Sequence, residues 1–389
     1  MELDFKKYGY MFSDDDTVEF YCEPSDFTNF DENEDIYVTG TFNGWLNTGD
    51  SSWKMTRKVS KGKTYFSLVK PVSMIFVPGN TGFPEFRFFG LSSKSNTLLI
   101  DKPSFKKYSF NENRLIFKTA EGMEEINRLN TQLVFKKSLS DFDLNCPACR
   151  ADISNVRLVP GTKCLFRGYN PFKRSKSEFD TEDERLSLVQ KAYELYGIRS
   201  DITLNGYEGA SVAAGETLPD VIKNIEKEDN RLCINIDYNL VYFHPDAVDF
   251  SCAMRNIALF IISHPGPFYI HCRLGSDRTG VTCAVLAALC GASWKEIAYD
   301  YERTSNMGIA EYRNRRLLQY SLTKMLGRNP ADSKDLAHLV QSYFIKENIL
   351  TMAEIKSLID KLLVPPKKKE TGYFDFTENH ICAKKNARI

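Results

Sequence analysis

The stretch from Pro267 to Leu289 constrains the fold of this chain more than any other part of the sequence. Residues 267–270 are apolar or aromatic and lead to Cys272, which is typical of a short buried strand. Residues 279–289 are mostly apolar or small, which is typical of a buried helix. A short loop therefore joins a strand to a helix. This unit indicates an α/β sheet with its ligand crevice at the carboxyl ends of the strands.

The loop between this strand and this helix is suited to binding an oxyanion. At a helix N-terminus, successive peptide N–H groups point inward and favour a bound anion. The same positive field stabilises the thiolate of Cys272, which makes it a nucleophile. Arg278 can hold two phosphate oxygens in a fork, and Gly275 supplies a backbone angle that residues with a β-carbon resist. The loop is predicted to hold a phosphate over a thiolate.

This loop resembles the signature of the cysteine-dependent protein tyrosine phosphatase superfamily, since it reads His-Cys-Arg-Leu-Gly-Ser-Asp-Arg-Thr-Gly at residues 271–280. The ending Asp-Arg-Thr-Gly is similar to the dual-specificity, phosphoinositide and myotubularin-like branches. The resemblance implies a phosphomonoesterase that works through a phosphocysteine intermediate, with no metal and no cofactor. The alternative is a buried cysteine at a strand end with an arginine packed nearby.

The resemblance also implies roles for single residues of the loop. Cys272 would be the nucleophile, and Arg278 with the loop amides would stabilise the charge of the transition state. His271 would organise the loop by hydrogen bonding, and Thr279 would place its hydroxyl near the sulfur and help it leave. The other residues expected to bind the phosphate are Arg273, Leu274, Gly275 and Ser276.

The general acid that protonates the leaving oxygen has two candidates. In dual-specificity enzymes this aspartate lies on a loop before the helix that precedes the signature strand, and Asp246 occupies that place. Asp249, on the same loop, suits the N-cap of the following helix. Asp277 is the rival, because myotubularin-like and some bacterial lipid-directed phosphatases have an aspartate there that is proposed as the acid. Asp277 could instead orient Arg278 or cap the helix.

Strands and helices alternate from about residue 155 onward. The predicted strands are 163–167, 198–204, 233–238 and 267–272. The predicted helices are 182–196, 218–225, 249–262, 279–290, 294–304, 311–326, 335–345 and 352–363. Two of these helices begin with capping-box spacings, at Thr181 with Glu184 and at Thr351 with Glu354. We expect an α/β phosphatase domain at residues 155–364, with a central, largely parallel sheet and C-terminal helices, and then a tail at 365–389.

Residues 1–120 show a different pattern. Short alternating apolar runs are broken by turn residues such as Asn43-Gly44 and Pro78-Gly79-Asn80, which favours an antiparallel β-sandwich. The predicted strands are 17–22, 36–42, 65–69, 86–89, 97–100 and 114–119. We therefore expect a multidomain chain, with a connecting segment at residues 121–154 between the sandwich and the α/β domain.

The sandwich sequence resembles the glycogen-binding carbohydrate modules of starch-branching enzymes and of the β subunit of AMP-activated kinase. The resemblance rests on Val-Thr-Gly-Thr-Phe-Asn-Gly-Trp at residues 38–45, on the neighbourhood of Trp53 and on Phe-Arg-Phe-Phe at 86–89. Such modules lay aromatic side chains against the rings of α-glucans. Trp45 matches one of these platform residues and is expected to bind glucan. The alternative is that Trp45 and Trp53 pack in the core of the sandwich.

Several phosphorylated partners stay open from the sequence. Glucan phosphatases join a carbohydrate module to a dual-specificity domain, so a phosphorylated glucan stands beside phosphoprotein and inositol phosphate or phosphoinositide. A basic stretch could border a multiply phosphorylated substrate, or it could be a solvated loop in which Arg167 is structural. Its members are Lys163, Arg167, Lys173, Arg174 and Lys176. The competing function is a catalytically silent sensor that binds phosphate or carbohydrate on the same fold.

The composition indicates which partners are not expected and in which compartment the protein is expected. The 389 residues include 51 Lys plus Arg and 51 Asp plus Glu, and this balance points away from nucleic acid. Residues 1–7 lack an apolar run, so no signal peptide is expected, and no stretch reaches the ~20 apolar residues of a transmembrane segment. Scattered cysteines fit a reducing interior, so we expect a cytoplasmic protein. Cys146 and Cys149 form a close pair that is either incidental or a regulatory disulfide.

Overall fold

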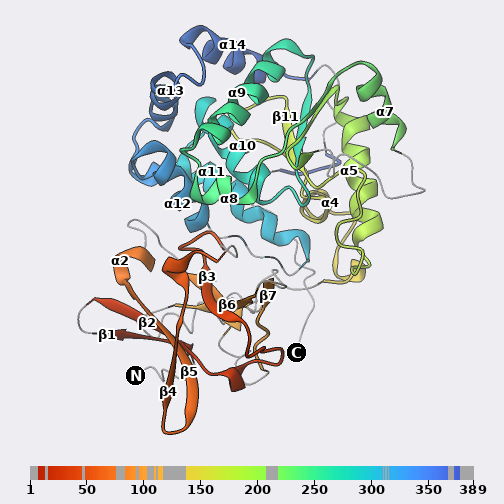
Figure 1. Cartoon of the computed structure of the whole chain (residues 1–389). Coiled ribbons are helices and arrows are strands. Elements are labelled where there is room, and N and C mark those ends of the chain that lie inside the picture. The colour runs from red at the N-terminus through yellow and green to blue at the C-terminus, as the bar shows by residue number, and fades with distance from the viewer. Residues whose placement is uncertain are drawn as a thin grey trace. The chain divides into compact units, whose positions relative to one another are not determined.

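Two compact units make up the chain, Met1–Gln132 and Leu133–Ile389 (Figure 1). The structure is a computed structural model. It describes residues 8–13, 16–45, 49–75, 84–92, 96–102, 109–110, 113–116, 137–206, 218–309, 311, 313, 315–366 and 372–376. The predicted turn at Pro78-Gly79-Asn80 and the end of the predicted strand 114–119 lie outside these residues.

The first unit contains two antiparallel sheets, as the sequence predicted. One has the strand order β1 (Tyr10–Ser13), β2 (Thr17–Cys22), β5 (Lys63–Pro71) and β4 (Thr56–Ser60). The other has the order β3 (Asp35–Gly40), β6 (Glu85–Leu91), β9 (Asn113–Leu115) and β8 (Ser109–Phe110), and β7 (Asn96–Leu98) also pairs with β6. The prediction missed β1, β4 and β8. Strand β4 is exposed along its whole length and so has no alternation of buried and exposed residues.

Aromatic side chains from the two sheets interlock to form the core of this unit. The ring of Phe20 on β2 lies 5.1 Å from that of Phe86 on β6, and Tyr10 on β1 lies 5.9 Å from Phe86. Trp53 is buried and stacks on Phe42 at 5.0 Å, so this tryptophan packs in the core. Trp45 differs, because it is only half-buried and lies in a turn with a φ of +64°.

The second unit is built on a five-stranded, mostly parallel sheet, which confirms the predicted α/β architecture. Its strand order is β10 (Arg157–Leu158), β11 (Leu165–Gly168), β14 (Phe268–His271), β12 (Ser200–Thr203) and β13 (Arg231–Cys233). Only the β10–β11 pair is antiparallel among these. In the register of the central strand, Ile270 lies beside Arg167 of β11 and Ile202 of β12. Strand β14 is buried along its length, as its apolar sequence requires.

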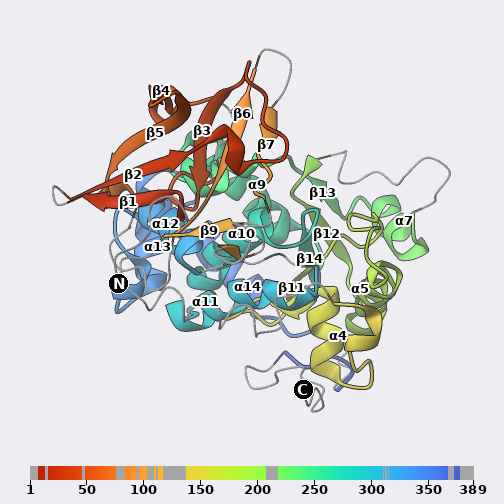
Figure 2. The ribbon, with the colours of Figure 1, turned by 90° about the horizontal axis from the view of Figure 1, so that it is seen from below.

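Helices cover both faces of this sheet (Figures 1 and 2). One group contains α4 (Pro147–Ser154), α5 (Glu182–Tyr196) and α7 (Asp220–Lys227). The other group contains α8 (Tyr238–Phe243), α9 (Val248–Ser263), α10 (Asp277–Leu289), α11 (Trp294–Arg303), α12 (Arg315–Leu326), α13 (Leu336–Lys346) and α14 (Met352–Leu362). Helix α10 is buried on every side beyond its first turn, which explains its uniformly apolar sequence. Among the described helices, none is both long enough and apolar enough to cross a membrane.

Three local predictions need correction or qualification. Thr181 does not cap α5, because its backbone is helical and its hydroxyl accepts a hydrogen bond from Arg185 Nη2 at 3.0 Å. The predicted strand 233–238 is misplaced, since β13 spans Arg231–Cys233 and α8 begins at Tyr238. The capping box of α14 is confirmed, with Thr351 Oγ1 accepting from the N–H of Glu354.

The predicted connecting segment and tail both contain ordered parts of the second unit. Helix α4 lies within residues 121–154, and its residue Ile153 is buried in the hydrophobic core of the second unit. Residues 372–376 return to this unit, where Phe374 is buried and its ring lies 6.2 Å from that of Tyr196. Cys146 has a free thiol whereas Cys149 is disulfide-bonded, so these two cysteines are not bonded to each other.

Candidate active site

The predicted loop lies at the carboxyl end of the central strand. Strand β14 ends at His271 and α10 begins at Asp277, so residues 272–276 turn from a strand directly into a helix. Gly275 has a φ of +74°, and a β-carbon there would lie 2.0 Å from the carbonyl oxygen of Gly168 at the end of β11. Only glycine fits this position, both for its backbone angle and for its space.

Every carbonyl of the loop is bound by a donor from outside it. The carbonyl of Cys272 accepts from His271 Nδ1 at 3.0 Å, and that of Arg273 accepts from the N–H of Asn170 at 3.4 Å. The other three bonds are Asn155 Nδ2 to Leu274 at 2.9 Å, Arg167 Nη2 to Gly275 at 2.7 Å and Arg167 Nη2 to Ser276 at 3.5 Å. Because all five carbonyls face outward, the intervening peptide N–H groups face the interior of the loop.

These inward amides form an anion-binding cradle. Within the described part of the chain, no acceptor contacts the peptide N–H groups of residues 273–278. The loop also leads into the N-terminus of α10, whose first amides have no partner within the helix. Cys272 is buried at the start of the cradle, with 3% of its surface exposed. A tetrahedral oxyanion bound by these amides would lie over its sulfur.

Arg278 differs from the other arginines around the loop. Arg167 is paired with Asp300 and Arg313 with Asp277, whereas no carboxylate lies within ion-pairing distance of Arg278 among the described residues. The Nε of Arg278 is buried and has no hydrogen-bond partner among the described residues. The hydroxyls of Ser276 and Thr279, close to Arg278 in the sequence, are also buried without a partner among those residues. These donors are available to a bound phosphate, and the guanidinium charge favours it.

A buried ion pair network supports the outer side of the loop. Asp300 on α11 binds Arg157 Nε through one oxygen and Arg167 Nη1 through the other, each at 2.5 Å. Burial would raise the pKa of Asp300, but the charges of the two arginines outweigh burial and hold it below its ordinary value. Asp300 thus stays ionised and fixes Arg167, which in turn holds the carbonyls of the loop. Arg167 is fully buried and structural, as one of the two readings of the basic stretch predicted.

His271 links the loop to the neighbouring strand. Its Nδ1 lies 3.0 Å from the carbonyl oxygen of Cys272 and therefore carries a proton. Its Nε2 lies 3.1 Å from Thr203 Oγ1 and 3.3 Å from Asp201 Oδ2 on β12. The Thr203 hydroxyl also donates to Asp201 Oδ1 at 3.1 Å. Both ring nitrogens of His271 thus have partners, and the ring joins the carbonyl of Cys272 to strand β12.

Asp201 is the buried carboxylate next to this ring. It is fully buried and accepts a hydrogen bond from Tyr193 at 2.6 Å, while Arg231 Nε lies 3.3 Å from its other oxygen. Burial would raise the pKa of Asp201, but His271, Arg231 and Tyr193 together hold it below its ordinary value. The ionised carboxylate of Asp201 thereby fixes the ring of His271, which binds the carbonyl of Cys272.

Asp277, one of the two candidates for the general acid, is engaged in an ion pair. Arg313 Nε lies 2.6 Å from its Oδ1 and Arg313 Nη2 lies 2.9 Å from its Oδ2. The hydroxyl of Tyr242 donates to Oδ1 at 2.6 Å. Burial would raise the pKa of Asp277, but these partners outweigh it and hold the pKa below its ordinary value. In this arrangement Asp277 orients Arg313 and is ionised at neutral pH.

Asp246, the other candidate, lies on the exposed turn between α8 and α9. Burial raises the pKa values of Tyr320 on α12 and Tyr343 on α13, and the negative charge of Asp246 raises them further. Among the described residues, no hydrogen bond or ion pair joins Asp246 to the loop. Asp249, expected as an N-cap, is instead in the first turn of α9.

The rim of the loop carries several cations, most of them already paired. Arg273 is exposed and donates to the carbonyl of Ser175 at 2.8 Å, which joins the loop to the basic stretch. Lys176 lies 2.8 Å from Glu311, and Arg174 is paired with Asp183. Leu274 directs its side chain into the hydrophobic core, so its contribution to the anion-binding cradle is its peptide N–H. Within the described ranges, no group of three His, Cys, Asp or Glu side chains could hold a metal ion.

Comparison with known protein families agrees with this geometry. Residues 226–363 match the model of the tyrosine phosphatase family. This region is a tyrosine phosphatase family domain. The matched residues include the Cys272 loop, helix α10 and Arg313. A comparison with curated proteins finds no match.

The family match confirms the predicted class of enzyme. A tyrosine phosphatase family domain implies a phosphoric monoester hydrolase that acts on a phosphorylated substrate. The N-terminal sheets lie outside the match, as do Arg167 and Asp201. The sequence prediction missed several residues that support the loop, namely Asn155, Asp201 and Asp300. No local pattern marks them, because Asp300 lies 133 residues from Arg167 and the contact exists only in the folded domain.

Proposed function

We propose that this protein is a cysteine-dependent phosphomonoesterase in which Cys272 is the nucleophile and Arg278 binds the phosphate. The observation that carries the proposal is the loop at residues 272–276, whose five carbonyls are all bound from outside. Its amides and the unpaired guanidinium of Arg278 are left for a dianionic ligand. The family match to residues 226–363 supports the same reaction class.

The reaction we propose has two steps. The thiolate of Cys272 attacks phosphorus, the S–P bond forms, and the P–O bond to the leaving group breaks while a carboxylic acid protonates the leaving oxygen. A water then attacks the phosphocysteine and passes its proton to the resulting carboxylate, and the S–P bond breaks to restore the thiolate. In both steps the loop amides and Arg278 stabilise the equatorial oxygens of the transferring group.

Asp246 is the general acid that we favour. The ion pair with Arg313 keeps Asp277 ionised, whereas Asp246 is exposed on a turn and has no such cation among the described residues. An acid must be protonated when the leaving group departs, so a carboxyl held as an anion is a poor donor. Asp277, at the start of α10, then serves to hold the guanidinium of Arg313.

Steady-state hydrolysis of p-nitrophenyl phosphate without added metal tests the proposal. The wild type should turn over, while Cys272→Ser and Arg278→Ala should each lose at least about 10³-fold in kcat/KM, since they remove the nucleophile and the main cationic contact. Cys252→Ser removes an exposed, free cysteine of α9, outside the loop, and should leave the rate unchanged. Trapping of a phosphorylated Cys272 at acid pH would identify the intermediate.

A folded wild type that turns over none of the substrates would overturn the proposal. It would favour the alternative, a catalytically silent protein that binds phosphate or carbohydrate. Circular dichroism and binding of inorganic phosphate would then separate loss of folding from loss of chemistry. Activity that survives Cys272→Ser would equally contradict the mechanism.

The substrate we favour is a phosphotyrosyl protein, with phosphorylated glucan and inositol phosphate or phosphoinositide as rivals. The family match points to the first. The rim supports it as well, because Lys176 and Arg174 are already paired with carboxylates and are not free to bind a polyanion. A panel of phosphotyrosyl peptide, phosphoseryl peptide, phosphorylated amylopectin and phosphoinositides ranks these classes by kcat/KM. The expected cytoplasmic location and the glucan-binding role of Trp45 are further proposals that need their own tests.

A further inference from the structure

A cavity of about 370 Å³ lies at the edge of the central sheet opposite to the Cys272 loop. Its lining residues stand where three parallel strands begin, since Cys164 precedes β11, Arg199 precedes β12 and Pro267 precedes β14. Cys272 follows the other end of β14. The cavity is therefore separate from the phosphate loop, and its volume falls within the range of small-molecule sites, roughly 300–1,000 Å³.

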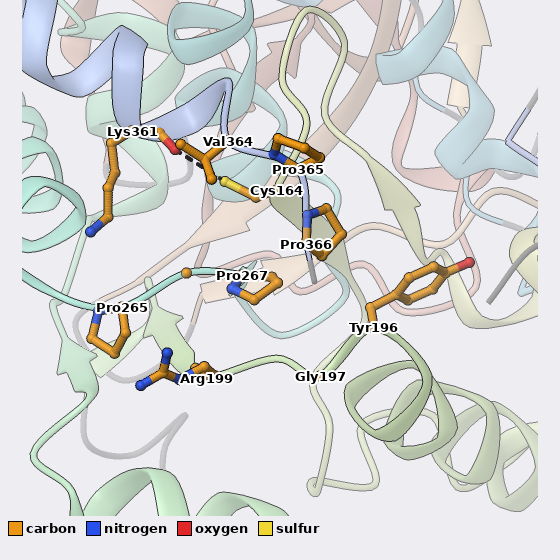
Figure 3. A pocket seen from close by; sticks show the side chains of 11 residues that line it. Cys164, Tyr196, Gly197, Arg199, Pro265, Pro267, Lys361, Val364, Pro365 and Pro366 are labelled. Carbon is orange, nitrogen blue, oxygen red and sulfur yellow. Dashed lines mark hydrogen bonds between the residues drawn. The ribbon is translucent and has the colours of Figure 1, made fainter. Parts of the chain in front are cut away.

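Hydrogen bonds join the segments that line the cavity. The bonds run from the N–H of Phe268 to Cys164 at 2.8 Å, from the N–H of Arg199 to Pro267 at 2.9 Å and from the N–H of Lys163 to Leu362 at 2.8 Å. The Cys164 thiol also lies 3.4 Å from the carbonyl oxygen of Lys361 (Figure 3). Four separate segments thus hold one another, and the cavity is formed before any ligand arrives.

The two ends of the cavity differ in chemistry. Figure 3 shows the side chains of Lys361 and Arg199 gathered near Pro265. Tyr196 lies on the other side, with Pro366 nearest to it, while Val364 and Pro365 line the cavity beside Cys164. The Tyr196 ring is itself fixed, since it stacks on Phe166 at 4.4 Å. One end offers positive charge and the other a flat apolar wall.

Neither cation has an acidic partner in the described part of the chain. No carboxylate lies within ion-pairing distance of Arg199 or Lys361 there. Other residues of the same elements do form ion pairs: Arg255 on α9 is paired with Glu354 on α14, the helix that carries Lys361. Two unpaired cations beside apolar walls concentrate a positive field in the cavity, and this field favours an anion.

We propose that this cavity binds a small amphipathic anion. A flat apolar body would lie against Tyr196 and the prolines, and a single carboxylate, sulfonate or phosphate group would lie between Arg199 and Lys361. The site is separate from the phosphatase chemistry and does not depend on it.

Fluorescence titration of the full chain with 1-anilinonaphthalene-8-sulfonate tests this site. The neutral relative N-phenyl-1-naphthylamine has a similar apolar body without the charge. We expect one saturable site for the anionic probe and about tenfold weaker binding of the neutral one, which is what one lost charge-assisted hydrogen bond costs. Arg199→Gln and Lys361→Gln should each weaken the anionic probe about tenfold and leave the neutral probe unchanged.

Three controls keep the test specific. Lys356→Gln removes an exposed lysine from α14 that does not line the cavity, so it should have no effect. Val364→Trp should block both probes by filling the cavity, and it should fold normally because Val364 is 58% exposed. Orthovanadate, which would occupy the Cys272 loop, should leave the titration unchanged.

The proposal fails if both probes bind equally well, if neither charge removal nor Val364→Trp weakens the anionic probe, or if orthovanadate displaces it. None of these outcomes depends on whether the protein turns over a phosphate ester. If the protein has no phosphatase activity but binds the probe as described, the proposal for this cavity stands and only the function proposed above is contradicted.

Discussion

Arg313 holds the carboxylate of Asp277 through two nitrogens, with Nε 2.6 Å from Oδ1 and Nη2 2.9 Å from Oδ2. The first residue of α10 is thereby joined to a segment 36 positions later in the chain. Glu311 extends the chain of charges, since it contacts Arg313 at 3.1 Å and Lys176 at 2.8 Å. An aspartate inside the signature loop is thus part of an ion pair network at the rim of the site, and this bears on the choice of general acid.

Replacing the two candidate acids separately should distinguish them. Asp246→Asn should lower kcat for phosphotyrosyl peptide by about 10²-fold, the usual loss when a general acid is removed. It should lower kcat less for p-nitrophenyl phosphate, whose leaving group needs less protonation. Asp277→Asn should affect both substrates to a similar degree, because it disturbs the position of Arg313. A leaving-group-dependent loss in Asp277→Asn, with none in Asp246→Asn, would reverse the assignment.

The Asp277–Arg313 pair should make the domain sensitive to acid. The folded-state pKa of Asp277 is lowered, so its contribution to stability is present above the ordinary aspartate range near 4 and is lost as the pH falls through the folded-state pKa. Urea denaturation at pH 7 should show Arg313→Gln destabilised by about 2 kcal/mol. The loss should become smaller as the pH falls below about 4. Arg174→Gln, which breaks an exposed pair with Asp183, should cost less than about 0.5 kcal/mol; equal losses in the two variants would contradict the prediction.

Asp201 should act on Cys272 through His271. Asp201→Asn removes the carboxylate that lies 3.3 Å from His271 Nε2, so the ring that binds the carbonyl of Cys272 is held less firmly. We expect kcat/KM for p-nitrophenyl phosphate to fall by about 10²-fold, because the loop loses its exact geometry. The rate of iodoacetamide alkylation at Cys272 should fall with it. Wild-type rates of both reactions in a folded Asp201→Asn variant would contradict this role.

Asp300 should be the most costly acidic residue to replace. Asp300→Asn leaves the guanidinium groups of Arg157 and Arg167 buried without their anion, a change that costs about 3–5 kcal/mol. Urea denaturation measures this loss, and the carbonyls of the loop would lose their fixed donor at the same time. Asp183→Asn is the matched control, because its side chain is 76% exposed and its loss should stay within about 0.5 kcal/mol. An Asp300→Asn variant as stable as this control would disprove the role given to the network.

The two tryptophans of the N-terminal unit should respond differently. Trp53→Ala should destabilise that unit by about 3–5 kcal/mol, because its ring is buried against Phe42. Trp45→Ala should cost only about 1 kcal/mol, since the ring is half-buried in a turn. If Trp45 is a sugar platform, the wild type should sediment with glycogen and Trp45→Ala should not. Sedimentation that is absent in the wild type, or unchanged in Trp45→Ala, would argue against glucan binding by this residue.

The Cys272 loop was predictable because its requirements are local. A buried strand, a glycine with a left-handed backbone and a helix start follow one another within a dozen residues, and each leaves a pattern in the sequence. The α14 cap was predictable for the same reason, since Thr351 and Glu354 contact each other across one turn. The false cap at Thr181 shows the limit, because a buried arginine competes for its hydroxyl.

The supporting residues were not predictable because their partners are distant in the chain. Asn155 meets Leu274 across 119 positions, and Arg167 meets Asp300 across 133. Single buried polar residues of this kind have no spacing rule, and their place becomes clear only when strands β11 and β14 are paired.

The five outward carbonyls of the loop have a consequence for how the protein is made. Their donors come from the end of α4, from β11, from the turn after β11 and from His271 at the end of β14, and Arg167 is held in place by α11. A ribosome that has delivered Cys272 and Arg278 has not yet delivered Asp300. Cys272 therefore reaches its folded surroundings only after Asp300 has been made, so a copy that ends before Asp300 would contain the motif without the ion pairs that support it.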